Sequence, residues 1–187
     1  MDPNTPASVQ ETTTSAVAAQ DDFSPEIRAL YQNASEHLWV QALASDDLKA
    51  WNYPIITKGE GIYLTDVQGN RFIDCISGVW VVNAGHGREE IAKAAYEQMK
   101  EVAYVNVFGF SHQPAIDLAT KLTSLAPGDL NHVYFANSGS EAVESAIKIT
   151  RNYHFNRGNG KKVKLISRIG SYHGVTMGAL SLNGAFY

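Results

Sequence analysis

The stretch Asn137-Ser138-Gly139-Ser140-Glu141 decides how this sequence folds. It follows a short apolar run at 132–136, typical of a buried strand, and it opens a helical pattern that ends near Phe155. After the glycine-containing loop 156–160, a second β-rich run covers 162–166. Strand, helix and strand in this order predict a parallel pair of strands with a right-handed crossover.

The start of this predicted helix has two compatible interpretations. A helix that begins after Ser138 exposes unpaired N–H groups and the positive end of the helix dipole. A phosphate group fits there, because Gly139 lets it approach the backbone closely and Ser138 and Ser140 add hydroxyl donors. The same residues also fit a capping box, with Ser138 as the cap and Glu141 reaching back to the start of the helix. The residues alone leave both interpretations open.

A second polar cluster, Gly170-Ser171-Tyr172-His173-Gly174, follows the second predicted strand. The turns after two parallel strands lie at the same edge of the sheet, which is where ligands bind in open α/β sheets. Tyr172 could therefore stack on a planar ring whose phosphate lies at Gly139 and Ser140. A loop aromatic that simply packs against its neighbours is the alternative.

Upstream of these motifs, the sequence predicts a helical and a hairpin segment. Ser24-Pro25 marks the start of a helix that runs to about Leu43. Two short β-rich runs, 62–66 and 71–76, flank a turn that contains Gly69 and predict a hairpin. Two further helices are expected at 89–102 and 111–125. We divide the chain into a flexible tail at 1–23, an N-terminal segment at 24–85 and a second domain from 86 to 187.

Charge and composition narrow the functional classes. The 187 residues carry 15 Lys+Arg against 19 Asp+Glu, which gives a net charge of −4. A nucleic-acid-binding surface needs an excess of basic groups, so this balance argues against a nucleic-acid partner. No apolar run reaches the roughly eighteen residues of a membrane-spanning helix, so no membrane association is expected.

Several other kinds of site are not expected from the residues. Cys75 is the single cysteine, so no internal disulfide can form, and a reducing compartment such as the cytoplasm is expected. Its place between apolar residues of the predicted hairpin suggests a small core side chain. The six histidines are scattered without ligand spacing, so no metal site is predicted. Gly85-His86-Gly87 lacks the third glycine of a dinucleotide-binding turn.

Taken together, the motifs resemble those of the class III aminotransferases. The resemblance is carried by Asn137 to Glu144 and by Ser171-Tyr172-His173-Gly174, and it extends upstream to Ser77-Gly78-Val79-Trp80. Val82 to Arg88 is similar to the ω-transaminase branch. These enzymes use pyridoxal 5′-phosphate (PLP) and have fold type I. The resemblance implies an α/β fold in which a helix and a β-hairpin segment, part of a small domain, precede the start of an incomplete PLP-binding large domain.

The resemblance also implies roles for particular residues. The cofactor would be held by residues of the two motifs, which are Ser138, Gly139, Ser140, Tyr172, His173 and Gly174. Tyr172 would stack on the pyridine ring, and Ser140 would bind the phosphate. Trp80 and Phe108 would line the substrate pocket, with Trp39 and Tyr53 as further candidates. The lysine that binds the cofactor covalently is expected beyond Tyr187, so no catalytic residue is assigned within this chain.

The function implied is transfer of an amino group from an amine or ω-amino acid to a keto acid such as pyruvate. The full-length protein would be a homodimer, and the 187-residue chain would be its inactive N-terminal part. Two alternatives remain at this point. The chain could be a catalytically incomplete module that binds PLP, phosphate or another protein. It could also belong to an aminomutase, epimerase or decarboxylase of the same family.

Overall fold

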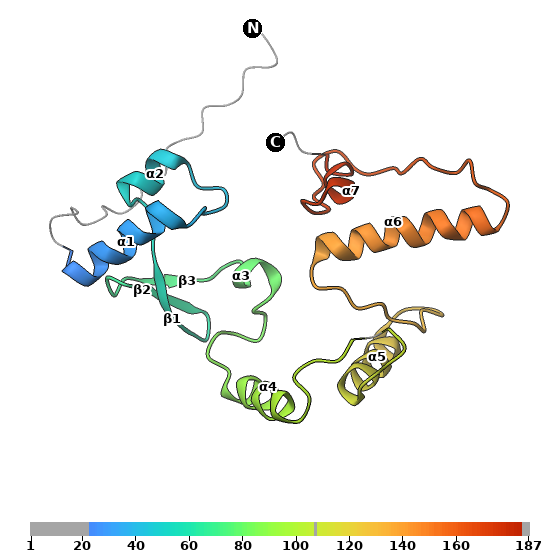
Figure 1. The fold of residues 1–187 in the computed structure, drawn as a ribbon, viewed down its shortest axis with the longest axis horizontal. Coiled ribbons are helices and arrows are strands. Elements are labelled where there is room, and N and C mark those ends of the chain that lie inside the picture. The colour runs from blue at the N-terminus through green and yellow to red at the C-terminus, as the bar shows by residue number, and fades with distance from the viewer. Residues whose placement is uncertain (1–22, 107, 185–187) are drawn as a thin grey trace, which may run out of the picture. The chain divides into compact units, whose positions relative to one another are not determined.

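The computed structural model describes residues 23–106 and 108–184. The predicted flexible tail therefore lies outside the described residues, apart from Phe23. The chain divides after Ala103 into two compact units, whose elements are labelled in Figure 1. Within the described ranges, no helix combines the length and apolar character that crossing a membrane requires.

The first unit begins with helix α1, Pro25–His37. As predicted, Ser24 is the N-cap, and its hydroxyl accepts a hydrogen bond from the Ile27 N–H at 3.3 Å. The helix ends at His37, short of the predicted Leu43, because Leu38 adopts an extended backbone conformation. A separate short helix, α2, Ser45–Ala50, follows and was not predicted.

Stacked aromatic rings form the core of this first unit. Tyr31 is only 1% exposed. Its ring stacks on Phe23 at 5.5 Å and on Trp51 at 5.4 Å between centroids, and it meets Tyr53 edge-on. The Tyr31 hydroxyl also donates to the Tyr53 carbonyl oxygen at 3.0 Å. These contacts fix the two helices to the start of the sheet. They also place the ring of Tyr53, a candidate pocket residue, within this cluster.

The sheet of the first unit has three antiparallel strands in the order β1-β2-β3. They are β1 Ile56–Glu60, β2 Tyr63–Asp66 and β3 Arg71–Ile73. The β2–β3 pair confirms the predicted hairpin, whereas β1 was not predicted. Asp66 fixes the turn between them, because its carboxylate accepts hydrogen bonds from the N–H groups of Gln68 at 2.9 Å and Asn70 at 2.8 Å.

Beyond the hairpin the chain forms a tight turn and then a regular helix. The turn is labelled α3, Ser77–Trp80, and the helix is α4, Glu89–Glu101, close to the predicted 89–102. The prediction that Cys75 is a core residue is wrong, because its side chain is exposed. Strand β3 ends at Ile73, so the alternation that would have turned Cys75 inward does not continue.

The second unit contains helices α5 Gln113–Leu125, α6 Gly139–Asn156 and α7 Met177–Leu180. The predictions for α5 and α6 are confirmed to within two residues, whereas α7 was not predicted. The predicted parallel strands are wrong for the described part of the chain, where 132–136 and 162–166 are not strands. A strand exists through its ladder of hydrogen bonds, and neither run pairs with another strand there.

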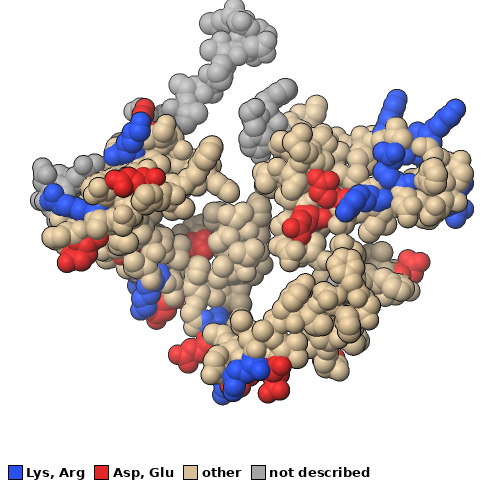
Figure 2. All heavy atoms as spheres, in the orientation of Figure 1, with Lys and Arg blue, Asp and Glu red and all other residues tan. Residues whose placement is uncertain are grey.

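Helix α6 carries acidic side chains near its start and basic ones near its end. Figure 2 shows red side chains over the first turns of α6, and blue ones over its end and the loop that follows. Glu141 and Glu144 belong to the first group, whereas Arg151 and Arg157 belong to the second. This distribution stabilises the helix, because each charge faces the dipole end of opposite sign.

Candidate functional site

The predicted cap at the start of α6 is present. Ser138 is the N-cap, and its hydroxyl accepts a hydrogen bond from the Glu141 N–H at 3.2 Å. The Glu141 carboxylate reaches back one residue further than a capping box requires. It accepts from the Asn137 N–H at 3.0 Å and from the Asn137 side-chain amide at 3.1 Å. The negative charge of Glu141 is therefore directed toward Asn137, on the chain that enters the helix.

The first turn of α6 still offers donors. The N–H groups of Gly139 and Ser140 are at the first two helical positions, where no acceptor exists within the helix. Among the described residues neither N–H has another acceptor. A Cβ atom added at Gly139 would meet no heavy atom within 4 Å, so the space in front of this turn is open. An anionic group fits these donors and this space.

The loop that carries Tyr172 packs directly on this turn. The Ser140 hydroxyl accepts a hydrogen bond from the Val175 N–H at 3.0 Å, which leaves its own proton free to donate. A Cβ added at Gly174 would lie 2.5 Å from the Ser140 hydroxyl oxygen and 2.9 Å from Ala179 Cβ. Only glycine therefore allows this close approach. The structure thus brings together two motifs that are 35 residues apart in sequence.

Two residues that sequence reasoning missed hold this loop in place. The Asn183 amide oxygen accepts from the His173 N–H at 2.6 Å, and its amide nitrogen donates to the Gly174 carbonyl at 2.9 Å. The Glu144 carboxylate accepts from the N–H groups of Gly178 at 2.7 Å and Ala179 at 3.3 Å, at the start of α7. An asparagine ten residues from its partner gives no local sequence signal. In the sequence, Glu144 lies one helical turn beyond Ser140 and looks like an ordinary acidic residue on a helix surface.

The side chains of this loop differ in their surroundings. Tyr172 is 54% exposed, so much of its ring is free to contact a ligand. The His173 Nε2 atom is buried and has no hydrogen-bond partner among the described residues. An orphaned polar atom in the loop that packs on this turn is consistent with a site that binds a polar group. Ser138, by contrast, uses its hydroxyl as a helix cap.

The residues expected to line the substrate pocket are also exposed. Trp80 is 72% exposed at the end of the α3 turn, and Phe108 is 90% exposed on the loop before α5. Trp39 is 91% exposed. Trp80 belongs to the first unit and Phe108 to the second, and a pocket shared by the two residues stays a prediction. In the part of the chain that the structure describes, no group of His, Cys, Asp or Glu could hold a metal ion.

Comparisons with known proteins give matches over most of this chain. A family model described as aminotransferase class-III matches residues 47–185. The uncharacterized aminotransferase YhxA of Bacillus subtilis is 51% identical over 130 residues, which are 70% of this chain and 28% of YhxA. The putrescine–pyruvate aminotransferase of Pseudomonas aeruginosa is 40% identical over 163 residues, which are 81% of this chain and 36% of that enzyme. The chain thus spans about a third of the length of these relatives.

A solved structure is similar over most of the chain. The ω-transaminase of Pseudomonas jessenii in complex with PMP has a TM-score of 0.80 and 33% identity, covering 83% of this chain and 35% of that one. This likeness confirms the expected α/β fold of a fold type I transferase. Because the family model covers well over half of the residues, including both motifs at the α6 turn, the chain belongs to the class III aminotransferase family.

Proposed function

We propose that this chain is the N-terminal part of a PLP-dependent aminotransferase that moves an amino group from an amine or ω-amino acid to a keto acid such as pyruvate. The contact between the Ser140 turn and the Gly174 loop carries the proposal, because it joins an anion-binding helix start to an exposed aromatic ring. The relative in Pseudomonas aeruginosa, named for putrescine and pyruvate, supports this choice of substrates. The PMP complex of the Pseudomonas jessenii enzyme supports the choice of cofactor.

The residues at the start of α6 suit the phosphate of the cofactor. The free N–H groups of Gly139 and Ser140 would donate to the phosphate oxygens, and the Ser140 hydroxyl would add a third hydrogen bond. Ser138 would act by capping the helix, which holds these donors in place. When bound, PLP supplies the electron sink for amino transfer. The chain's own residues bind and orient it.

The loop over this turn suits the ring of the cofactor. Tyr172 would stack on the pyridine ring, exclude water from one face and keep the ring in a fixed plane. The buried Nε2 of His173 lacks a partner within the described residues and would face a polar group of the complete site. Gly174 would contribute by its small size, since it lets the loop reach Ser140.

The remaining assignments concern the complete protein. Trp80 and Phe108 would line the pocket for the amine donor, and the lysine that binds the cofactor would lie beyond Tyr187. Residues 24–85 would be part of a small domain, and residues 86–187 would begin the PLP-binding large domain. We further propose that the complete enzyme is a homodimer that works in the cytoplasm.

The decisive experiment changes Gly139 in the complete protein. Because a side chain at this position meets open space, Gly139→Val should leave the thermal unfolding temperature within a few degrees of the parent value. It should raise the dissociation constant for PLP at least about tenfold by filling the phosphate position. Ala142→Val, at an exposed position three residues further along the helix, is the matched control and should bind PLP like the parent.

Activity is measured in the same preparations. The parent, saturated with PLP and given putrescine and pyruvate, should form alanine. Gly139→Val should lose this activity at limiting PLP and recover part of it at high PLP. Unchanged PLP binding by Gly139→Val, or a parent that forms no alanine from any primary amine, would contradict the proposal.

A further inference from the structure

The turn that ends in Trp80 has an unusual backbone. Ser77, Gly78, Val79 and Trp80 all have positive φ angles, of 50°, 58°, 64° and 69°. Only glycine adopts this left-handed conformation readily, because a Cβ atom crowds the following carbonyl oxygen. Three of these residues, Ser77, Val79 and Trp80, carry side chains. They keep this conformation only if their surroundings support it strongly.

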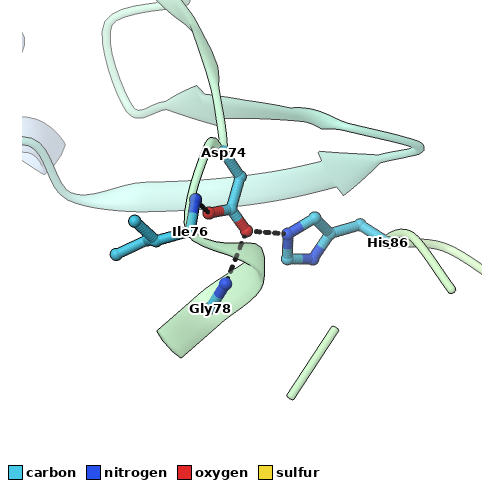
Figure 3. Close-up of polar contacts among 4 residues, drawn as sticks. All are labelled: Asp74, Ile76, Gly78 and His86. Carbon is cyan, nitrogen blue, oxygen red and sulfur yellow. Dashed lines mark hydrogen bonds and ion pairs between the residues drawn. The ribbon is translucent and has the colours of Figure 1, made fainter. Parts of the chain in front are cut away.

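The support comes from the carboxylate of Asp74 (Figure 3). One oxygen, Oδ2, accepts a hydrogen bond from the Gly78 N–H at 2.8 Å, and Oδ1 accepts from the Ile76 N–H at 3.3 Å. The Asp74 side chain is 5% exposed, whereas the donor residues Ile76 and Gly78 are exposed. The carboxylate therefore closes the turn from its N-terminal side.

His86 fixes the direction of this carboxylate. Its Nε2–H donates to Asp74 Oδ2 at 2.9 Å, as drawn in Figure 3. The backbone of His86 is itself held, because it exchanges two hydrogen bonds, of 2.8 Å and 3.0 Å, with Gly61 on the β1–β2 hairpin. A Cβ at Gly59 would lie 2.8 Å from the imidazole ring, so the sheet leaves this ring little room to shift.

From this network we propose that Asp74, oriented by His86, is a positioning residue that fixes the left-handed turn. The turn sets the position of the Trp80 side chain, and this position determines which amine donors fit beside it. Asp74 acts through the turn and does not touch the substrate. The part of the proposal that concerns amine donors rests on the proposed function of Trp80 as a pocket residue. The part that concerns the turn rests only on the contacts of Asp74 and His86.

The first test measures the turn itself. In the complete protein without cofactor, Asp74→Asn should accelerate amide hydrogen exchange in the peptide that contains Ile76 and Gly78 by about tenfold or more, because hydrogen bonds to a charged acceptor are lost. His86→Gln should accelerate it less. Asp66→Asn is the matched control, since Asp66 is a buried aspartate that caps the other end of the same hairpin. It should leave exchange at residues 76–78 unchanged.

The second test measures donor selection. The readout is the ratio of kcat/KM for a bulky arylalkylamine to that for a small ω-amine. Trp80→Ala should change this ratio, and Asp74→Asn should change it in the same direction by about threefold or more, because a displaced side chain alters the fit of one donor more than the other. Asp66→Asn should keep the parent ratio.

The outcomes separate the two claims. A changed ratio in Trp80→Ala with a parent-like ratio in Asp74→Asn would overturn the role of Asp74 in donor selection. Parent-like exchange at residues 76–78 in Asp74→Asn would overturn its role in the turn. A parent-like ratio in Trp80→Ala would contradict the pocket assignment and with it the donor part of the inference, whereas the exchange data would still decide what holds the turn.

Discussion

The turn that carries Trp80 and the loop that carries Tyr172 both present an exposed aromatic ring, but their polar partners lie at different distances along the chain. The Trp80 turn is held by Asp74 and His86, which are only 12 residues apart. The Tyr172 loop has a local partner in Asn183, ten residues from His173, but it also depends on Ser140, which is bonded to a residue 35 positions away. The first arrangement is local and the second requires packing between distant segments.

This difference has a consequence for stability. A segment whose partners are local forms together with its own hairpin, so it tolerates changes elsewhere in the chain. A segment held by distant partners unfolds when any one of those long-range contacts is broken. We therefore expect substitutions at the Tyr172 loop to have larger effects than equivalent substitutions at the Trp80 turn.

The largest effect is expected from Gly174→Ala. The added methyl group would lie 2.5 Å from the Ser140 hydroxyl oxygen, and the residue has a φ of 130°. A cost of about 3 kcal/mol in the free energy of unfolding is expected from overpacking and backbone strain together. Urea unfolding of the complete protein without cofactor measures this cost, and limited proteolysis shows whether the loop around Tyr172 opens.

The matched substitution at the other segment is Gly78→Ala. Its methyl group would lie 2.9 Å from Val82 Cγ2, the end of a side chain that can rotate away, and its φ of 58° is strained for alanine. A cost of about 1 kcal/mol is expected. If Gly78→Ala destabilised the protein as much as Gly174→Ala, the contrast between local and distant support would be wrong.

An intermediate effect is expected from Tyr172→Ala on cofactor binding. Loss of the ring contact should weaken PLP binding by about 1 kcal/mol or somewhat more, which is about fivefold in the dissociation constant. Tyr172→Phe keeps the aromatic face and should bind PLP almost like the parent. Trp80→Ala should not change PLP affinity. Release of PLP during dialysis distinguishes the variants, and equal retention by Tyr172→Ala and the parent would refute the stacking role.

The same contrast explains which parts of the fold could be predicted from the sequence. The caps at Ser24 and Ser138 and the hairpin turn at Gly69 depend on neighbours within a few residues, and all three were predicted. The runs 132–136 and 162–166 have the composition of strands. Their pairing depends on segments elsewhere, and in the described residues no ladder forms. Strand composition alone therefore did not decide their structure.

The residues of the candidate site likewise differ in whether the sequence alone could reveal them. Gly139, Ser140 and Tyr172 were identified from motifs whose residues are contiguous in the sequence. Asp74 and His86 were missed because their relation appears only when the chain folds back from the hairpin. A weak signal was present, since an aspartate shortly before a Ser-Gly pair is typical of a turn in which the carboxylate accepts backbone N–H groups.

The smallest effect is expected from acid pH at the Trp80 turn. The hydrogen bond from His86, aided by the N–H groups of Gly78 and Ile76, lowers the pKa of Asp74 below its ordinary value of 3.8. A carboxyl group whose pKa is lowered by folding stabilises the protein fully above its unfolded pKa, and this contribution is lost as the pH falls through the lower folded pKa. The difference in urea midpoint between the parent and Asp74→Asn should therefore be constant from pH 7 to about pH 5 and shrink only in stronger acid. A difference that vanished already between pH 7 and pH 6 would mean that the ionisation of another group, and not that of Asp74, controls the turn.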